Sequence, residues 1–163
     1  MKKLISILLV LVSSNALSAL PKQAVLPAEL AHKAVIAAVD QCRKNGYTVS
    51  AAIVDVSGVL RAQLRADSAG AHTLDSSFKK AYTSASLKDS TQNLANLIHK
   101  KPELQTLRDM NNSILLLGGG LPIVMDNEVV GGIGVGGAPG AHLDEACAKA
   151  ALQAIGAVIE SEK

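Results

Sequence analysis

The sequence predicts a single α+β domain, in which helices pack on one antiparallel sheet of about five strands. Three observations predict it: a helical apolar stripe near the start, a second stripe at the end, and two pairs of short β-type segments joined by turns. In chain order these give a helix, two strands, helices, three strands and a helix. No repeat or linker interrupts this order, so we expect one domain rather than two.

The first half of this domain combines a helix and a hairpin. Residues 27–45 carry apolar side chains every three or four positions, which predicts a helix that Gly46 ends. Residues 47–56 are rich in β-branched and small side chains. After the turn signal Ser57-Gly58, apolar and polar residues alternate from 60 to 65, as expected of a hairpin with one polar face.

A polar segment, residues 68–86, follows the hairpin and is expected to form a helix that begins near Thr73. Shorter helical stretches are predicted around residues 94–98 and 104–110, on either side of Pro102. Residues 114–117 read as a buried strand. Residues 121–125 and 129–135 then form a second hairpin around Asp126-Asn127, and a helix over residues 141–160 closes the chain.

The chain begins with a pattern typical of a secretory signal peptide. Lys2 and Lys3 precede an apolar run over residues 4–12, and small residues follow up to Ala19. We therefore expect residues 1–19 to be removed, leaving a domain over residues 20–163 that is periplasmic or secreted. No apolar run approaches the ~20 residues of a membrane span, so no stable membrane insertion is expected.

The charge balance argues against a nucleic-acid partner. Removal of the two leader lysines reduces the 16 basic residues to 14, which equals the 14 acidic ones. Proteins that bind nucleic acids carry a basic excess gathered on one surface. A formally neutral domain lacks that excess, which argues equally against an anionic membrane surface as partner.

The two cysteines, Cys42 and Cys147, lie on the apolar stripes of the first and last helices. If these helices are antiparallel neighbours, an oxidising compartment would allow the pair to form a disulfide. The alternative is two buried thiols, because free cysteine is among the most buried residue types. The sequence leaves both open.

Glycine-rich runs at residues 118–120 and 131–140 lack the ending of a phosphate-binding P-loop. They serve either close backbone approach or, before the last helix, an anion held by unpaired N–H groups. Two of the four histidines, His72 and His142, each follow a Gly-Ala pair at a helix entrance. They are either surface residues or ligands, whereas His32 and His99 are expected on the surface.

Several motifs in this order resemble the GlcG/HbpS-like family, also called the haem-degrading domain family. They are RAD at residues 65–67, KAYT at 80–83, GGLP at 119–122 and GGIGVGG at 131–137. The resemblance implies a profilin-like fold with a five-stranded sheet, homo-oligomers, and tetrapyrroles or small oxygenated metabolites as ligands. Because the chain has no CxxCH motif, any haem would be bound non-covalently.

We expect the ligand pocket at the entrance of the polar helix, where the chain departs from the family's usual Asp-Gly-Ala after the second strand and places His72. His72 would ligate the haem iron, with His142 as the alternative, and Lys80 would pair with a ligand carboxylate unless it is a solvated lysine. The remaining expected contacts are the side chains of Asp67, Tyr82 and Thr83 and the backbone at Gly119, Gly136 and Gly137.

Three functions are consistent with this pocket. The first is a periplasmic protein that binds haem or another tetrapyrrole. The second is an enzyme acting on a small hydroxy or oxo acid, although the sequence shows no complete catalytic constellation. The third is a non-catalytic oligomeric accessory to a sensor or transporter, which requires only surfaces.

Overall fold

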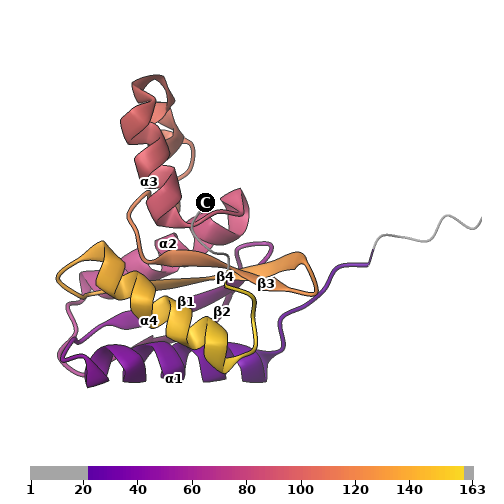
Figure 1. Cartoon of the computed structure of the whole chain (residues 1–163), viewed down its shortest axis with the longest axis vertical. Coiled ribbons are helices and arrows are strands. Elements are labelled where there is room, and N and C mark those ends of the chain that lie inside the picture. Colours follow the sequence, from indigo (N-terminus) through magenta and orange to yellow (C-terminus); the bar gives the residue numbers. More distant parts are fainter. Residues whose placement is uncertain (1–21, 160–163) are drawn as a thin grey trace, which may run out of the picture.

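The computed structural model describes residues 22–159, so the expected leader at residues 1–19 lies outside the described residues. Within them, one sheet contains four strands in the order β2-β1-β4-β3, and all neighbouring strands are antiparallel (Figure 1). No helix in this part of the chain has the length and apolarity that a membrane span needs. The strands are β1 Ser50–Asp55, β2 Leu60–Arg65, β3 Gly120–Met125 and β4 Glu128–Gly136.

The expectation of a fifth strand at residues 114–117 is wrong, because this segment joins no ladder. The backbone N–H of Leu115 donates instead to the hydroxyl of Thr83, at 2.8 Å. Ile114 is buried while Leu117 is 49% exposed. The apolar run at residues 114–117 therefore buries one side chain, that of Ile114, and its backbone is hydrogen-bonded to Thr83 rather than to a strand. The profilin-like arrangement stays a prediction.

Helices α1 (Ala28–Lys44) and α4 (Ala141–Ala154) pack side by side on one face of the sheet, as Figure 1 shows. Their buried stripes and the inner side of the sheet form the main core, which consists largely of alanine, valine, leucine and isoleucine. The structure joins Cys42 and Cys147 in a disulfide, with the two Cα atoms 5.5 Å apart. This bond links α1 to α4 within that core.

Helix α2 (His72–Leu87) covers the opposite face of the sheet, where Ala81 and Ala85 pack against β1. It lies directly on β4, because a Cβ on Gly132 or Gly134 would overlap the backbone of α2. These glycines therefore allow a helix to approach a strand closely, which is the first of the two uses expected for the glycine-rich run. The result is a sheet between two helical layers.

The remaining elements lie at the periphery. Helix α3 (Thr91–Lys100) rises from the α2 side of the sheet, followed by the 3-10 helix η1 (Pro102–Asp109) (Figure 1). The turn at Asp126 and Asn127 has positive φ at both residues, as expected of a type I′ hairpin. The last helix ends at Ala154 rather than at 160. After Gly156, with φ of +73°, the chain turns back and the Val158 N–H donates to β3.

Candidate functional site

The loop over residues 136–140 joins β4 to α4 and lies against the first turns of α2. A Cβ on Gly136 would lie 2.7 Å from Ser76 Oγ, and one on Gly137 would lie 2.7 Å from the carbonyl oxygen of Thr48. Gly137 has φ of +132°, which L side chains rarely adopt. Both glycines therefore let this loop approach the chain on either side of it.

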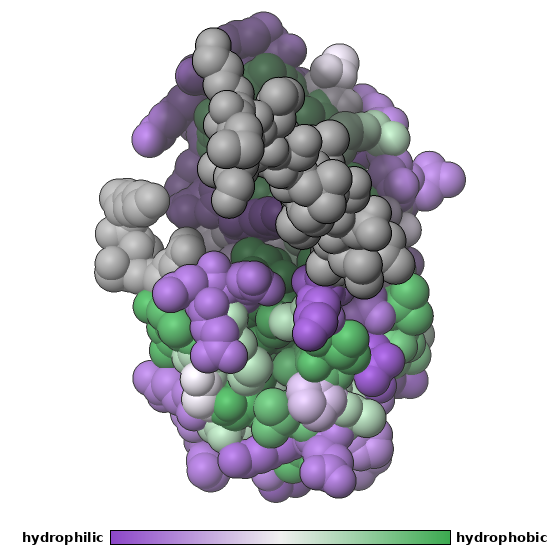
Figure 2. Space-filling model, turned by 90° about the vertical axis from the view of Figure 1, so that its right-hand side faces the viewer, coloured by the Kyte–Doolittle hydropathy of each residue, from purple (hydrophilic) through white to green (hydrophobic). Residues whose placement is uncertain are grey.

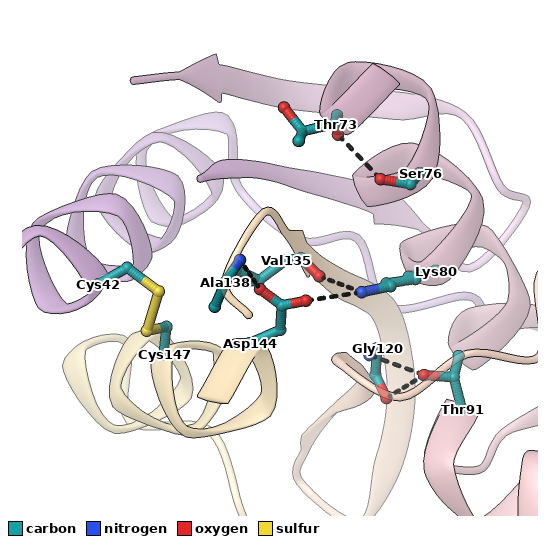
Figure 3. Close-up of polar contacts among 10 residues, drawn as sticks. All are labelled: Cys42, Thr73, Ser76, Lys80, Thr91, Gly120, Val135, Ala138, Asp144 and Cys147. Carbon is teal, nitrogen blue, oxygen red and sulfur yellow. Dashed lines mark hydrogen bonds and ion pairs between the residues drawn. A yellow bond between two sulfur atoms is a disulfide. The ribbon is translucent and has the colours of Figure 1, made fainter. Parts of the chain in front are cut away.

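A buried ion pair lies beneath this loop. Lys80 Nζ donates to Asp144 Oδ2 at 2.9 Å and to the carbonyl oxygen of Val135 at 2.8 Å (Figure 3). The other carboxylate oxygen of Asp144 accepts the backbone N–H of Ala138 at 3.0 Å. The two charged side chains are only 2% and 5% exposed. One lysine and one aspartate thus hold α2, the end of β4, the glycine-rich loop and α4 together.

Lys80 was expected either to pair with a ligand carboxylate or to be solvated, and the structure shows neither. Its ammonium is buried rather than solvated, and its carboxylate partner belongs to the chain itself. The loop before α4 likewise receives a carboxylate from within, since Asp144 accepts the Ala138 N–H that was expected to face a ligand. The cation that would bind an acidic substrate is therefore already neutralised inside the fold.

The other residues expected on α2 serve internal contacts. Thr83 donates to the carbonyl oxygen of Lys79 at 2.8 Å and accepts the N–H of Leu115. Tyr82 is half-buried, and its ring packs so close to Gly58 that a Cβ there would lie 2.5 Å from it. Both side chains are anchored to segments that flank α2, away from the loop at residues 136–140.

Gly119 lies at the ion pair. With φ of +109°, its backbone approaches α4 so closely that a Cβ would lie 2.7 Å from Asp144 Cβ and 3.0 Å from Lys80 Nζ. Its carbonyl oxygen accepts the N–H of Val135. Among the expected site residues, the structure thus brings Gly119 and Lys80 together, with a structural role visible for both.

His72 is exposed at the first position of α2, and a short turn positions it. Arg65, at the end of β2, donates two guanidinium hydrogen bonds to the carbonyl oxygen of Ala69. Asp67 is exposed in this turn. The imidazole lies back over the chain, since a Cβ on Gly70 would lie 2.6 Å from His72 Cε1.

His142 repeats this arrangement at the second position of α4. It is exposed, and a Cβ on Gly140 would lie 2.8 Å from its Cε1. Neither the His72 nor the His142 side chain makes a hydrogen bond or ion pair within residues 22–159. Gly70 and Gly140, two residues before these histidines, have no side chain to cover the rings. Both imidazoles are therefore open to solvent.

The entrances of α2 and α4 meet at the same loop. A Cβ on Gly137 would lie 3.4 Å from Thr73 Cγ2, next to His72, while Asp144, two residues after His142, bonds Ala138. The two exposed imidazoles are therefore carried by elements that pack on the loop over residues 136–140. The buried ion pair fixes both elements from below.

Sequence reasoning missed Asp144 as the partner of Lys80. Asp144 and Glu145 both follow His142 at the start of the last helix, where acids suit the positive end of the helix dipole and require no specific partner. The two residues lie 64 positions apart. The available signal was an acid that follows a glycine-rich loop, but two adjacent acids, Asp144 and Glu145, stand there, and pairing the first with Lys80 requires the tertiary fold.

Most of the chain matches one protein family and solved structures of similar fold. The family model described as "Haem degrading protein HbpS-like" matches residues 26–153. A crystal structure of a double mutant of HbpS from Streptomyces reticuli is 40% identical, with a TM-score of 0.77, over 82% of this chain and 89% of that one. The crystal structure of a PduOC:haem complex is 25% identical, with a TM-score of 0.76, over 83% of this chain and 98% of that one.

A curated relative covers a shorter stretch. It is a 15.0 kDa protein encoded in the dhaT-dhaS intergenic region of Citrobacter freundii, 33% identical over 86 residues. The match spans 52% of this chain and 61% of the relative. Because the family model covers well over half of the sequence and the fold agrees with solved members, this chain belongs to the HbpS-like family of haem-degrading proteins.

Proposed function

We propose that this chain is an exported protein that binds haem non-covalently, with His72 as the axial ligand. The carrying observation is the exposed, unbonded imidazole of His72 at the entrance of α2, repeated by His142 on the neighbouring helix. Membership of the HbpS-like family and the likeness to a PduOC:haem complex support haem as the ligand.

The residues present fit a haem. One imidazole is sufficient as an axial protein ligand, and the His72 ring has no hydrogen-bond partner within residues 22–159 that haem would have to displace. No cluster of three or more side chains able to hold a bare metal ion occurs in the described part of the chain. When bound, haem would supply iron redox chemistry, while the chain would supply the ligand and the loop that orients it.

Export is supported by the disulfide as well as by the leader. Disulfides persist in the periplasm and outside the cell and are rare where glutathione keeps thiols reduced. The Cys42–Cys147 bond is buried in the core between α1 and α4. An exported location is where such a bond would form and remain.

Titration of the purified mature protein with haemin tests the proposed ligand. We expect a saturable shift of the Soret band in the wild type, and loss of that shift in His72→Ala, because the variant removes the iron-binding nitrogen. His142→Ala is measured in parallel. The matched controls are His32→Ala and His99→Ala, since both residues are exposed histidines on other helices. Equal titrations for wild type and His72→Ala would contradict the assignment of His72.

We further propose that the protein is a homo-oligomer. Strand β2 is an edge of the sheet, and the exposed apolar residues include Leu60 and Leu64 on it and Val59 beside it. Figure 2 shows apolar surface, in green, between hydrophilic residues on the side of the molecule that it presents. Exposed apolar surface of this kind is typical of contacts between protein chains.

Light scattering of the mature protein tests the oligomer. We expect a mass of at least twice that of one chain at micromolar concentration, because association would cover the apolar side chains on β2. Leu60→Lys combined with Leu64→Lys should lower that mass without unfolding the domain, since both positions are exposed. A monomeric wild type at this concentration would rule the proposal out.

A further inference from the structure

A cleft of about 620 Å³ lies between α3 and α4, beside β3 and the segment that follows α4. Its apolar lining comes from all four of these parts. His72, His142 and the loop over residues 136–140 do not contribute to it. Figure 1 shows α3 rising from the sheet, and four residues of this helix line the cleft: Asn93, Asn96, Leu97 and Lys100. The apolar side chains in it are Leu97, Leu121, Pro122, Leu152, Val158 and Ile159.

The charged lining carries a cationic excess. Three lysines and two acids line the cleft, a formal charge of +1; Glu145 has a lysine as its partner, whereas Asp89 has only uncharged hydrogen-bond donors. Asp89 accepts hydrogen bonds from the N–H of Ser90 and from Asn93 Nδ2, at 2.7 and 2.9 Å. Glu145 pairs with Lys149 at 2.9 Å. Lys88 and Lys100 make no ion pair within residues 22–159.

Lys88 occupies a position that favours glycine. It follows the last residue of α2 with φ of +54° and ψ of +37°, the left-handed conformation in which helices commonly end. A residue with a Cβ is less favourable than glycine in this conformation. This position lines the cleft and bears one of its two cations without an ion pair within residues 22–159. An outlier of this kind is a reason to look for function.

We propose that the cleft is a second ligand site, which takes an anionic amphipathic small molecule: an aliphatic or aromatic body that carries a carboxylate or sulfonate. The apolar body would lie on the residues from α3, β3 and α4, and the oxyanion would lie between Lys88 and Lys100. The volume lies in the range of small-molecule pockets, which combine an apolar lining with a few charged groups that fix orientation. This site is separate from the histidines of the proposed haem site.

Fluorescence titration with anilinonaphthalene sulfonate, an anion with an aromatic body, tests this proposal on the folded mature protein. We expect saturable binding that decanoate displaces and that decanol, with the same chain and no charge, displaces far less well. Lys88→Gly and Lys100→Gln should each weaken binding by roughly five- to tenfold, because each removes one charge-assisted contact. Raised ionic strength should weaken the wild type in the same direction.

Two features keep the test independent of misfolding. Lys88→Gly should leave the melting temperature equal or higher, since glycine relieves the left-handed backbone. Lys101→Gln is the matched control, because it removes the same charge from a neighbouring residue. Lys101 follows Lys100 in the chain and is exposed, but unlike Lys100 it does not line the cleft. We expect this variant to bind the probe like the wild type.

Three results would overturn the proposal. One is equal binding by Lys88→Gly, Lys100→Gln and Lys101→Gln, which would remove the lysines from the site. Another is equal displacement by decanol and decanoate, which would leave no role for the anion. The third is loss of probe binding in His72→Ala, which would show that the cleft is not a separate site. Retained probe binding in His72→Ala, even if haem fails to bind, supports the cleft alone.

Discussion

Replacement of Lys80 by methionine is expected to lower the free energy of unfolding by about 3–5 kcal/mol, because it leaves a buried carboxylate without its countercharge. The Asp144 side chain is only 5% exposed, and the Lys80 ammonium is the only cation that it contacts in the described structure. A domain with a typical stability of about 5–15 kcal/mol would lose a large part of it. Urea unfolding, followed by circular dichroism, measures the difference.

Lys79→Met provides the matched control for this experiment. Lys79 is the preceding residue of α2, and its partner Asp75 lies 3.0 Å away with 67% of its side chain exposed. Such a surface pair contributes at most about 1 kcal/mol. The double variant Lys80→Met with Asp144→Leu should be more stable than the sum of the single effects predicts, since no unpaired charge remains. Equal midpoints for Lys79→Met and Lys80→Met would contradict the role assigned to the ion pair.

Removal of the disulfide is expected to cost about 4–5 kcal/mol. Cys42 and Cys147 close a loop with a sequence separation of 105 residues, and a cross-link over such a distance strongly restricts the unfolded chain. The double variant Cys42→Ala with Cys147→Ala keeps two small apolar residues at these fully buried positions. The loss therefore reports mainly the bond rather than a change in packing.

Unfolding midpoints with and without reductant complete this test. The wild type in excess dithiothreitol should unfold at the same denaturant concentration as the double alanine variant, because both lack the cross-link. The double variant should not respond to reductant. If reductant leaves the wild-type midpoint unchanged while the protein is shown to be reduced, the disulfide does not stabilise the fold as described.

The fold could be predicted from local patterns wherever one side of an element is buried. The helical stripes gave α1 and α4 at nearly their observed starts, and Asp126-Asn127 indicated the turn of the second hairpin. The strand expected at residues 114–117 failed because a short apolar run also suits a segment attached to a helix. The end of α4 was placed too late, since the sequence stripe continues past Gly156 while the chain turns toward β3.

The candidate site was predictable only in part, because some of its features are local in the sequence and others join residues that are far apart in it. Gly-Ala-His at two helix entrances is a local signal, and both histidines are exposed there. The partner of Lys80 lies far away in the sequence, and the residues next to a lysine in the sequence do not show whether its side chain is buried or solvated. The family resemblance indicated an antiparallel sheet with helices and haem as the ligand class, although with one strand too many, whereas the burial of Lys80 required the packing of α2 on β4.

Chemical rescue of haem binding is the most direct test of the central claim that His72 ligates haem iron. The His72→Gly variant of the mature protein is titrated with haemin, first alone and then with added imidazole, and the Soret band is recorded. We expect the variant to lose the wild-type band and imidazole to restore it with saturation, because a free imidazole can occupy the vacated axial position. A wild-type spectrum in His72→Gly without imidazole would contradict the claim.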